Sequence, residues 1–217
     1  MKKILFLILS LLLVGGCTNK EAFPLPQVSE GLRGQLGIDA NINEATIDNY
    51  LNIEDALYYD MRMLKDDAEY ENIGGDSYLS GFVNGFEVLP FPYLCTISGL
   101  PEEVGKSYNG ETLYTLTSDG EYIPNYEESY EVLEYFFPKD KIIFLMCGGG
   151  GYAGLTKNML ITLGWDETKI YNVGAYWSYE GNNNVKVKTT RNNKIVYDFW
   201  KIPYHDINFK TLHKLEQ

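Results

Sequence analysis

One short stretch, residues 141–164, constrains the fold of this chain more than any other part. Its apolar run at 142–146 is too short for a typical helix and fits a strand buried on both faces of a sheet. Cys147 follows directly, then four consecutive glycines, and then an amphipathic run that stops at Gly164. Glycine after an amphipathic run is a common helix stop. The stretch therefore predicts a strand, a glycine loop that carries a cysteine, and a helix.

This arrangement makes Cys147 a candidate nucleophile. Backbone N–H groups of a glycine loop can converge on one point, and the N-terminus of a helix is the positive end of its dipole. Both effects stabilise a sulfur anion, so we expect a lowered thiol pKa. The candidate N–H donors are Gly148, Gly149, Gly150, Gly151 and Tyr152. The alternative is a plain glycine-rich turn around a buried, unreactive cysteine.

The first residues have the pattern of a secretion signal. Lys2 and Lys3 precede an almost wholly apolar run at 4–14, which is short for a membrane span. Val14-Gly15-Gly16-Cys17 resembles the lipobox of bacterial lipoproteins. That resemblance implies that residues 1–16 are removed and that Cys17 carries the lipid. It places the protein at the cell membrane, lipid-anchored on the extracytoplasmic face; an ordinary cleaved signal peptide is the alternative.

The remaining chain suits one domain with short extensions. Residues 17–30 contain prolines without clear periodicity and are interpreted as a tether, 31–180 as the domain, and 181–217 as a hairpin and tail. The chain has 30 acidic against 18 basic side chains and a net charge of −12. Such an acidic protein offers no basic patch for nucleic acid or anionic lipid headgroups. Membrane attachment would therefore come from the lipid alone.

Strand and helix patterns alternate along the domain. Strands are expected at 56–61, 86–94, 142–146 and 170–173, with helices at 126–137 and 155–163 and a loop at 65–76. This alternation predicts an α/β fold with a mainly parallel central sheet covered by helices on both faces. Residues 185–190 and 194–202, joined by 191–193, are expected to form a polar β-hairpin.

Four ordered motifs together resemble the rhodanese-like family, a sulfurtransferase fold with a central parallel sheet. The resemblance covers residues 49–177. Asp60-Met61-Arg62 is similar to the D-x-R after an early strand, and residues 81–90 are similar to the segment G-H-I-x-G-A…I-P. Residues 147–152 fit the six-residue active loop C-x-x-G-x-x. Residues 174–177 are similar to the closing G-x-x-W.

The resemblance implies a function for each of these positions. Cys147 would take sulfur from a small sulfur-containing donor of the thiosulfate type and pass it, as a persulfide, to a thiol or cyanide acceptor. Asp60 and Arg62 would support the site as a buried ion pair. No cofactor and no metal are implied. The chain departs from the family at Phe82, which replaces a histidine, and in lacking a cation directly after Cys147.

Two other functions stay open at this stage. The same fold can serve as a catalytically inactive binding module, because fold alone does not decide function. Cys147 could also form a thiol-redox pair with Cys95, although the chain lacks the C-x-x-C pattern of thioredoxins. Cysteine phosphatases are excluded, because Ala153 occupies the position of their phosphate-binding arginine.

Overall fold

The computed structural model describes residues 25–34, 36–68, 70–97 and 108–216. The predicted signal peptide, residues 1–16, and the lipidation site Cys17 lie outside the described residues. Within the described residues, no helix combines the length and the apolar character that crossing a membrane requires.

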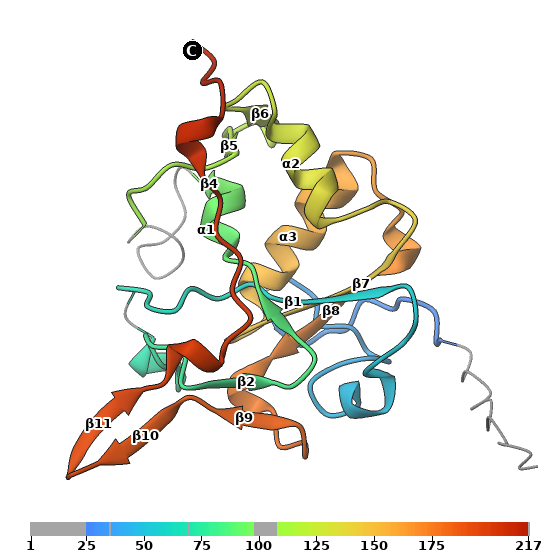
Figure 1. Cartoon of the computed structure of the whole chain (residues 1–217). Helices are drawn as coiled ribbons and strands as arrows, with labels where there is room; N and C mark the ends of the chain where they lie inside the picture. Colours follow the sequence, from blue (N-terminus) through green and yellow to red (C-terminus); the bar gives the residue numbers. More distant parts are fainter. Residues whose placement is uncertain (1–24, 35, 69, 98–107, 217) are drawn as a thin grey trace, which may run out of the picture.

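A four-stranded parallel sheet forms the centre of the molecule (Figure 1). Its order is β3 (Glu87–Val88), β1 (Ala56–Asp60), β7 (Ile142–Cys147) and β8 (Ile170–Ala175). All three neighbouring pairs run parallel. The prediction of an α/β fold with a central parallel sheet is confirmed.

The two faces of the sheet carry separate hydrophobic clusters, as expected for a strand buried on both sides. Along β7, Ile143, Leu145 and Cys147 belong to the cluster on one face. Phe144 and Met146 alternate with them and belong to the cluster on the other face. The apolar run therefore places the Cys147 side chain on a defined face of the sheet.

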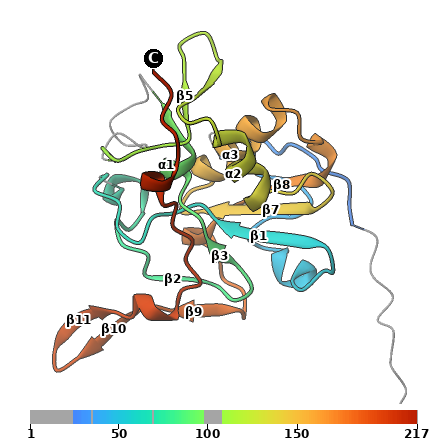
Figure 2. The same cartoon turned by 45° about the horizontal axis from the view of Figure 1, so that its top comes forward.

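Helices α2 (Ser129–Phe136) and α3 (Gly151–Thr162) lie on the same side of the sheet as Cys147 (Figure 2). Both fall inside or close to their predicted ranges, and Gly164 adopts a positive φ of 96° just after α3, as a helix stop does. The opposite face is covered by N-terminal chain that includes the 3-10 helix η1 (Ile47–Tyr50). The sequence predicts helices on this face as well, but the structure has a mostly irregular segment there.

The prediction of one extended segment at 86–94 is wrong. β3 occupies only Glu87–Val88, and Phe91–Leu94 forms the short helix α1. Pro92 lies in the first turn of this helix, where its missing N–H costs nothing. Among its described residues, the predicted loop at 65–76 contains the 3-10 turn η2 (Glu71–Ile73).

Smaller sheets surround the centre. One contains β4 (Cys95–Ile97), β5 (Tyr114–Leu116) and β6 (Tyr122–Pro124). β2 (Gly81–Val83) pairs antiparallel with β9 (Asn184–Lys186). The remaining 3-10 turns are η3 (Glu167–Lys169), η4 (Tyr176–Ser178), η5 (Phe199–Lys201) and η6 (Phe209–Thr211).

The C-terminal antiparallel pair is shorter than the predicted hairpin. It contains β10 (Lys188–Arg191) and β11 (Lys194–Tyr197), joined through Asn192 and Asn193, both at positive φ. Two consecutive residues at positive φ are typical of the tight type I′ turn. Val185, predicted as hairpin, belongs instead to β9 and so ties the C-terminal region to β2.

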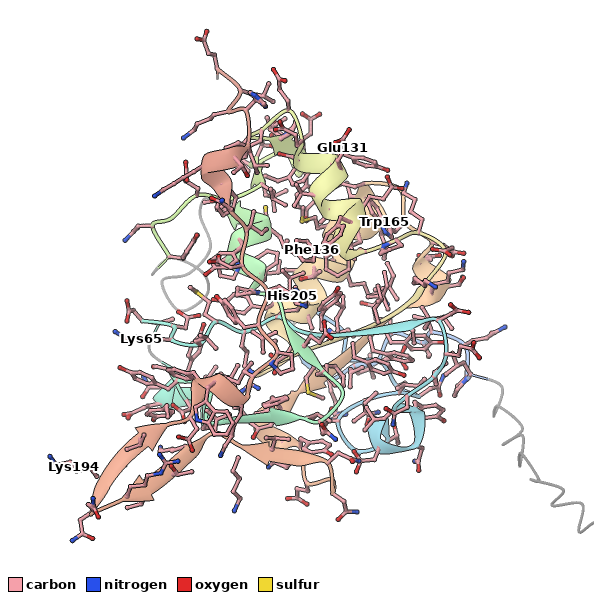
Figure 3. All side chains as sticks on the ribbon, viewed as in Figure 1. Lys65, Glu131, Phe136, Trp165, Lys194 and His205 are labelled. Atoms are coloured by element: carbon pink, nitrogen blue, oxygen red, sulfur yellow. The ribbon has the colours of Figure 1, made fainter. Side chains whose placement is uncertain are left out.

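Residues after β11 return across the molecule and cover the β3 edge of the central sheet (Figure 1). Val88 N–H donates to the Pro203 carbonyl, and His205 N–H donates to the Val88 carbonyl. The His205 ring lies against Phe136, with centroids 5.5 Å apart (Figure 3). The edge strand therefore has hydrogen-bond partners in the same chain.

The described part of the predicted tether also packs on the domain. Leu25 and Val28 contact the hydrophobic cluster around β8, and the Tyr171 hydroxyl donates to the Pro26 carbonyl at 2.7 Å. Residues 25–30 therefore contribute to the domain rather than only leading to it.

Candidate active site

Cys147 is the last residue of β7 and lies at the start of the glycine loop. Its side chain is 2% exposed, and the backbone N–H of Gly150 donates to its Sγ at 3.1 Å. Gly150 has a φ of +90°, which side-chain-bearing residues adopt only with strain. The loop therefore needs glycine at this position to turn an N–H group back toward the sulfur.

A neighbouring strand holds this loop in place. Asn172, fully buried on β8, donates from Nδ2 to the carbonyl of Gly150 and to that of Gly37, both at 3.3 Å. Gly150 is thus held by two hydrogen bonds, one from its N–H to the sulfur and one to its carbonyl from Asn172. Asn172 was not predicted as a site residue, because only the three-dimensional register brings it beside the loop.

Cys147 borders a cavity of about 200 Å³. Three of the predicted loop glycines, Gly148, Gly149 and Gly151, border it, and so does Tyr152. The structure also brings Arg62 to this cavity, whereas Asp60 lies behind it as the partner of Arg62. Residues separated by more than 80 positions in the sequence thus meet at one small space.

The Asp60–Arg62 pair is buried and geometrically complete. Arg62 Nε contacts both Asp60 carboxylate oxygens at 2.9 and 3.1 Å, and Nη2 contacts Oδ2 at 2.5 Å and the Gly81 carbonyl at 2.8 Å. The guanidinium also lies 4.1 Å from the ring centroid of Tyr176. Burial lowers the pKa of Arg62, but the charge and hydrogen bonds of Asp60, together with Tyr176 and Cys147, outweigh it and the pKa is raised. Arg62 therefore stays a cation at the cavity.

A carboxylate with two tyrosines forms another wall. The hydroxyls of Tyr152 and Tyr70 donate to Asp66 Oδ2 at 2.6 and 2.7 Å, and the two hydroxyl oxygens are 3.1 Å apart. Burial raises the pKa of both tyrosines, so they remain neutral donors. Tyr152 thus lines the cavity, as its place in the loop suggested. Asp66 and Tyr70 lie in a segment interpreted as loop and gave no sequence signal.

The Trp177 indole packs closely against two glycines. A Cβ atom on Gly148 would lie 2.4 Å from Trp177 Cζ2, and one on Gly75 would lie 2.4 Å from Cη2. The indole therefore approaches the backbone at both positions more closely than a side chain there would allow. The sequence favoured a core role for Trp177, but its side chain borders the cavity.

The prediction of a lowered thiol pKa is wrong for the unliganded site. Burial raises the pKa of Cys147, and the Asp60 charge raises it further. The N–H groups of Ala153 and Gly150 and the charge of Arg62 lower it, but burial prevails. The helix N-terminus and glycine loop are present as expected, yet the sulfur lies too far from solvent for them to decide the outcome. At neutral pH the resting residue is a thiol.

This raised pKa gives a measurable pH dependence. We expect the rate of Cys147 alkylation by iodoacetamide to reach half of its maximum at a higher pH than for an ordinary cysteine with its pKa of 9.0, because burial delays thiolate formation. Peptide mapping of the full chain separates Cys147 from the other cysteines. The urea-unfolded chain, in which the same thiol is solvated, is the control, and its alkylation rate should be half-maximal near pH 9. A half-maximal rate in the folded chain at or below the pH found for the unfolded chain would contradict the raised pKa.

No family model, curated protein or solved structure matches this chain.

Cys95 does not share the cavity with Cys147. Both cysteines are free and buried. Cys95 begins β4 in a separate small sheet, and burial raises its pKa to about 12. It is not among the residues that border the cavity. Among the described residues, no group of three or more His, Cys, Asp or Glu side chains is arranged to hold a metal ion.

Proposed function

We propose that this protein is a rhodanese-like sulfurtransferase in which Cys147 carries sulfane sulfur as a persulfide. We further propose that a lipid on Cys17 holds it on the extracytoplasmic face of the cell membrane. The observation that carries the first proposal is the meeting of Cys147 and Arg62 at one cavity, with the Gly150 N–H donated to Cys147 Sγ. These groups supply a nucleophile and the positive partners that an anionic sulfur needs.

The chemistry has two steps. In the first, the Cys147 thiol loses its proton to solvent, and the thiolate attacks the outer sulfur of the donor. A sulfur–sulfur bond forms to Cys147 while the bond from the donor's outer sulfur to its inner sulfur breaks. The electron pair of the broken bond leaves with the rest of the donor, which is sulfite when the donor is thiosulfate. In the second, cyanide or a thiolate attacks the terminal persulfide sulfur and leaves with it as thiocyanate or as a new persulfide, and the Cys147 thiolate is restored.

Arg62 supplies a cation that the active loop itself lacks. Its charge favours the thiolate form of Cys147, and its buried pairing with Asp60 keeps it in a fixed orientation. Forming a thiolate in a buried site costs free energy. This cost is smallest when the bound substrate and fixed protein dipoles surround the charge in place of water. A cavity of about 200 Å³ is small compared with the roughly 300–1,000 Å³ of sites for drug-sized ligands. It favours a small donor.

The redox alternative loses support from the position of Cys95. A thiol in a separate sheet and outside the cavity offers no visible route to a resolving role. The binding-module alternative predicts that Cys147 never acquires sulfur.

A sulfur-loading experiment tests the proposal. The full chain, purified in detergent, is exposed to thiosulfate, an organic thiosulfonate or a polysulfide, and its cysteine peptides are mapped by mass spectrometry. We expect one added sulfur on Cys147 that cyanide removes, complete loss of this product in Cys147→Ser, and no loss in Cys95→Ser. Persulfide formation elsewhere in Cys147→Ser would contradict the assignment. Absence of added sulfur with every donor, on folded protein, would favour the binding module.

A further inference from the structure

Positive charge is concentrated around the C-terminal hairpin of an otherwise acidic chain. Residues 184–201 carry five basic side chains and one acidic side chain, whereas the rest of the chain carries 13 basic and 29 acidic ones. β10 and β11 project from the body of the molecule in both views (Figures 1 and 2), and Lys194 lies at the outer end of the hairpin (Figure 3). The net charge of −12 therefore conceals a basic projection.

Three of these cations form a surface that we call the basic face: Arg191, Lys194 and Lys201. Arg191 Nη2 donates to both carboxylate oxygens of Asp198 at 2.9 and 2.7 Å, and Lys201 Nζ lies 3.1 Å from Oδ2. Lys194 is paired directly with Arg191 across the hairpin, so their side chains share one of its faces. The Asp198 side chain is 3% exposed and that of Arg191 is 58% exposed. The surface therefore presents the cations and hides the acid.

The opposite face of the hairpin contacts the protein itself. Lys188 and Tyr197 are paired on that face. Tyr197 stacks on Tyr78 with ring centroids 4.8 Å apart. Lys188 Nζ lies 3.9 Å from Asp76 Oδ2. That face is therefore already engaged, and the basic face is the one available to a partner.

An exposed tryptophan borders the basic face. Trp200 is 79% exposed, and Lys201 Nζ lies 5.7 Å from its ring centroid. A large ring gains free energy when it leaves water, and its N–H can stay hydrated if it lies at a boundary. Tryptophan is enriched at the headgroup level of membranes, where basic side chains bind anionic lipids. The combination favours a lipid surface over a wholly polar partner.

The length of the N-terminal segment keeps such a surface within reach. With a lipid on Cys17, as proposed above, Leu25 is the first described residue and follows eight positions later. An extended chain of that length spans at most about 30 Å, so the domain stays close to the bilayer. Anionic headgroups repel the acidic body and attract the hairpin, so the charge distribution favours one orientation of the domain.

We propose that the basic face and Trp200 form a docking surface for an anionic lipid bilayer and hold the domain against it. The setting rests on the proposed membrane location, but the surface does not depend on sulfur transfer. Each basic side chain close to an anionic surface strengthens binding about fivefold, and the indole enters the headgroup layer. The proposal replaces the expectation, drawn from overall charge, that membrane attachment comes from the N-terminal lipid alone.

Tryptophan quenching in vesicles tests the docking surface. The full chain is reconstituted into vesicles of phosphatidylcholine or of an equal mixture with phosphatidylglycerol, both with brominated acyl chains that quench nearby tryptophans. Subtracting the emission of Trp200→Phe isolates the signal of Trp200 from that of Trp165 and Trp177. We expect Trp200 emission to be quenched and blue-shifted in the mixed vesicles only, and to recover at high salt because salt screens the attraction.

A pair of charge reversals identifies the basic face. Lys194→Glu should remove most of the quenching in the mixed vesicles, because a repulsive charge replaces an attractive one at the outer end of the hairpin. Lys210→Glu is the matched control. It makes the same change at an exposed residue of η6, close to the C-terminus and far from the hairpin (Figure 1). Circular dichroism checks that both variants are folded.

The outcomes separate the docking surface from the proposed function. Equal Trp200 quenching in the two kinds of vesicle, or equal effects of the two charge reversals, would overturn the docking surface. Loss of self-association in Lys194→Glu, with Trp200 unquenched in every vesicle, would assign the basic face to the acidic body of a second copy instead. Flotation with phosphatidylcholine vesicles reports the N-terminal anchor. A chain that fails to float there but is quenched in mixed vesicles would refute the anchor and sustain the docking surface.

Discussion

Replacing Asp60 with asparagine should lower the free energy of unfolding by about 3–5 kcal/mol, the range for removing one partner of a buried ion pair. The substitution keeps the shape of the side chain but leaves the Arg62 guanidinium, 7% exposed, without its counter-charge. Urea denaturation of the full chain, followed by circular dichroism, measures the change. We expect a lower midpoint with an unchanged slope.

Two further variants identify the cause of that loss. Asp67→Asn, which removes the partner of Lys65 in an exposed pair, should leave the midpoint almost unchanged. The double replacement of Asp60 by leucine and Arg62 by methionine should recover much of the stability, because no unpaired charge stays buried. A single Asp60→Asn variant as stable as the wild type would show that the pair does not hold the site together.

Alanine at Gly148 should destabilise the fold by about 1–3 kcal/mol, the usual cost of overpacking a filled space, and should displace Trp177 from the cavity. The added Cβ would lie 2.4 Å from Cζ2 and 2.5 Å from Cε2 of the indole. Gly75 also restricts the ring, because even a Cβ there would lie only 2.4 Å from Cη2. Thermal unfolding measures the first effect, and sulfur loading of Cys147 measures the second.

Gly151→Ala provides the matched control in the same loop. A Cβ on Gly151 meets no atom within 4 Å, and the residue is the first of α3, where alanine is favoured over glycine. We expect an unchanged or slightly higher melting temperature and normal sulfur loading. If both alanine variants behaved alike, the close packing of Trp177 would not explain the glycine at position 148.

The parts of the fold that follow from local pattern were predictable. The apolar run of β7 and the glycine stop after α3 appear in the sequence as the structure has them, because periodicity and end signals act within a few residues. The short helix α1 was missed, since two prolines near Phe91 suggested extended chain. The pairing of β2 with β9 was also missed, because it joins segments about 100 positions apart.

Of the candidate site, the sequence indicated the cysteine, its glycine loop and the Asp60–Arg62 pair. Cys147 and its glycines have a recognisable spacing, and the Asp60–Arg62 pair could be expected from a motif. Asp66 and Trp177 reach the cavity only through long-range packing, which no short pattern records. The direction of the Cys147 pKa shift was missed for the same reason: it depends on burial at 2% exposure. A sequence indicates N–H donors near a sulfur more readily than it indicates how little water reaches it.

The return of residues 203–205 to the β3 edge has a consequence for how this protein is made. Val88 and its strand are synthesised more than 100 residues before their hydrogen-bond partners at Pro203 and His205. Until then the central sheet has an open edge, and such edges pair readily with other chains. Nascent or prematurely terminated forms of this protein should therefore depend on chaperones far more than the finished molecule does.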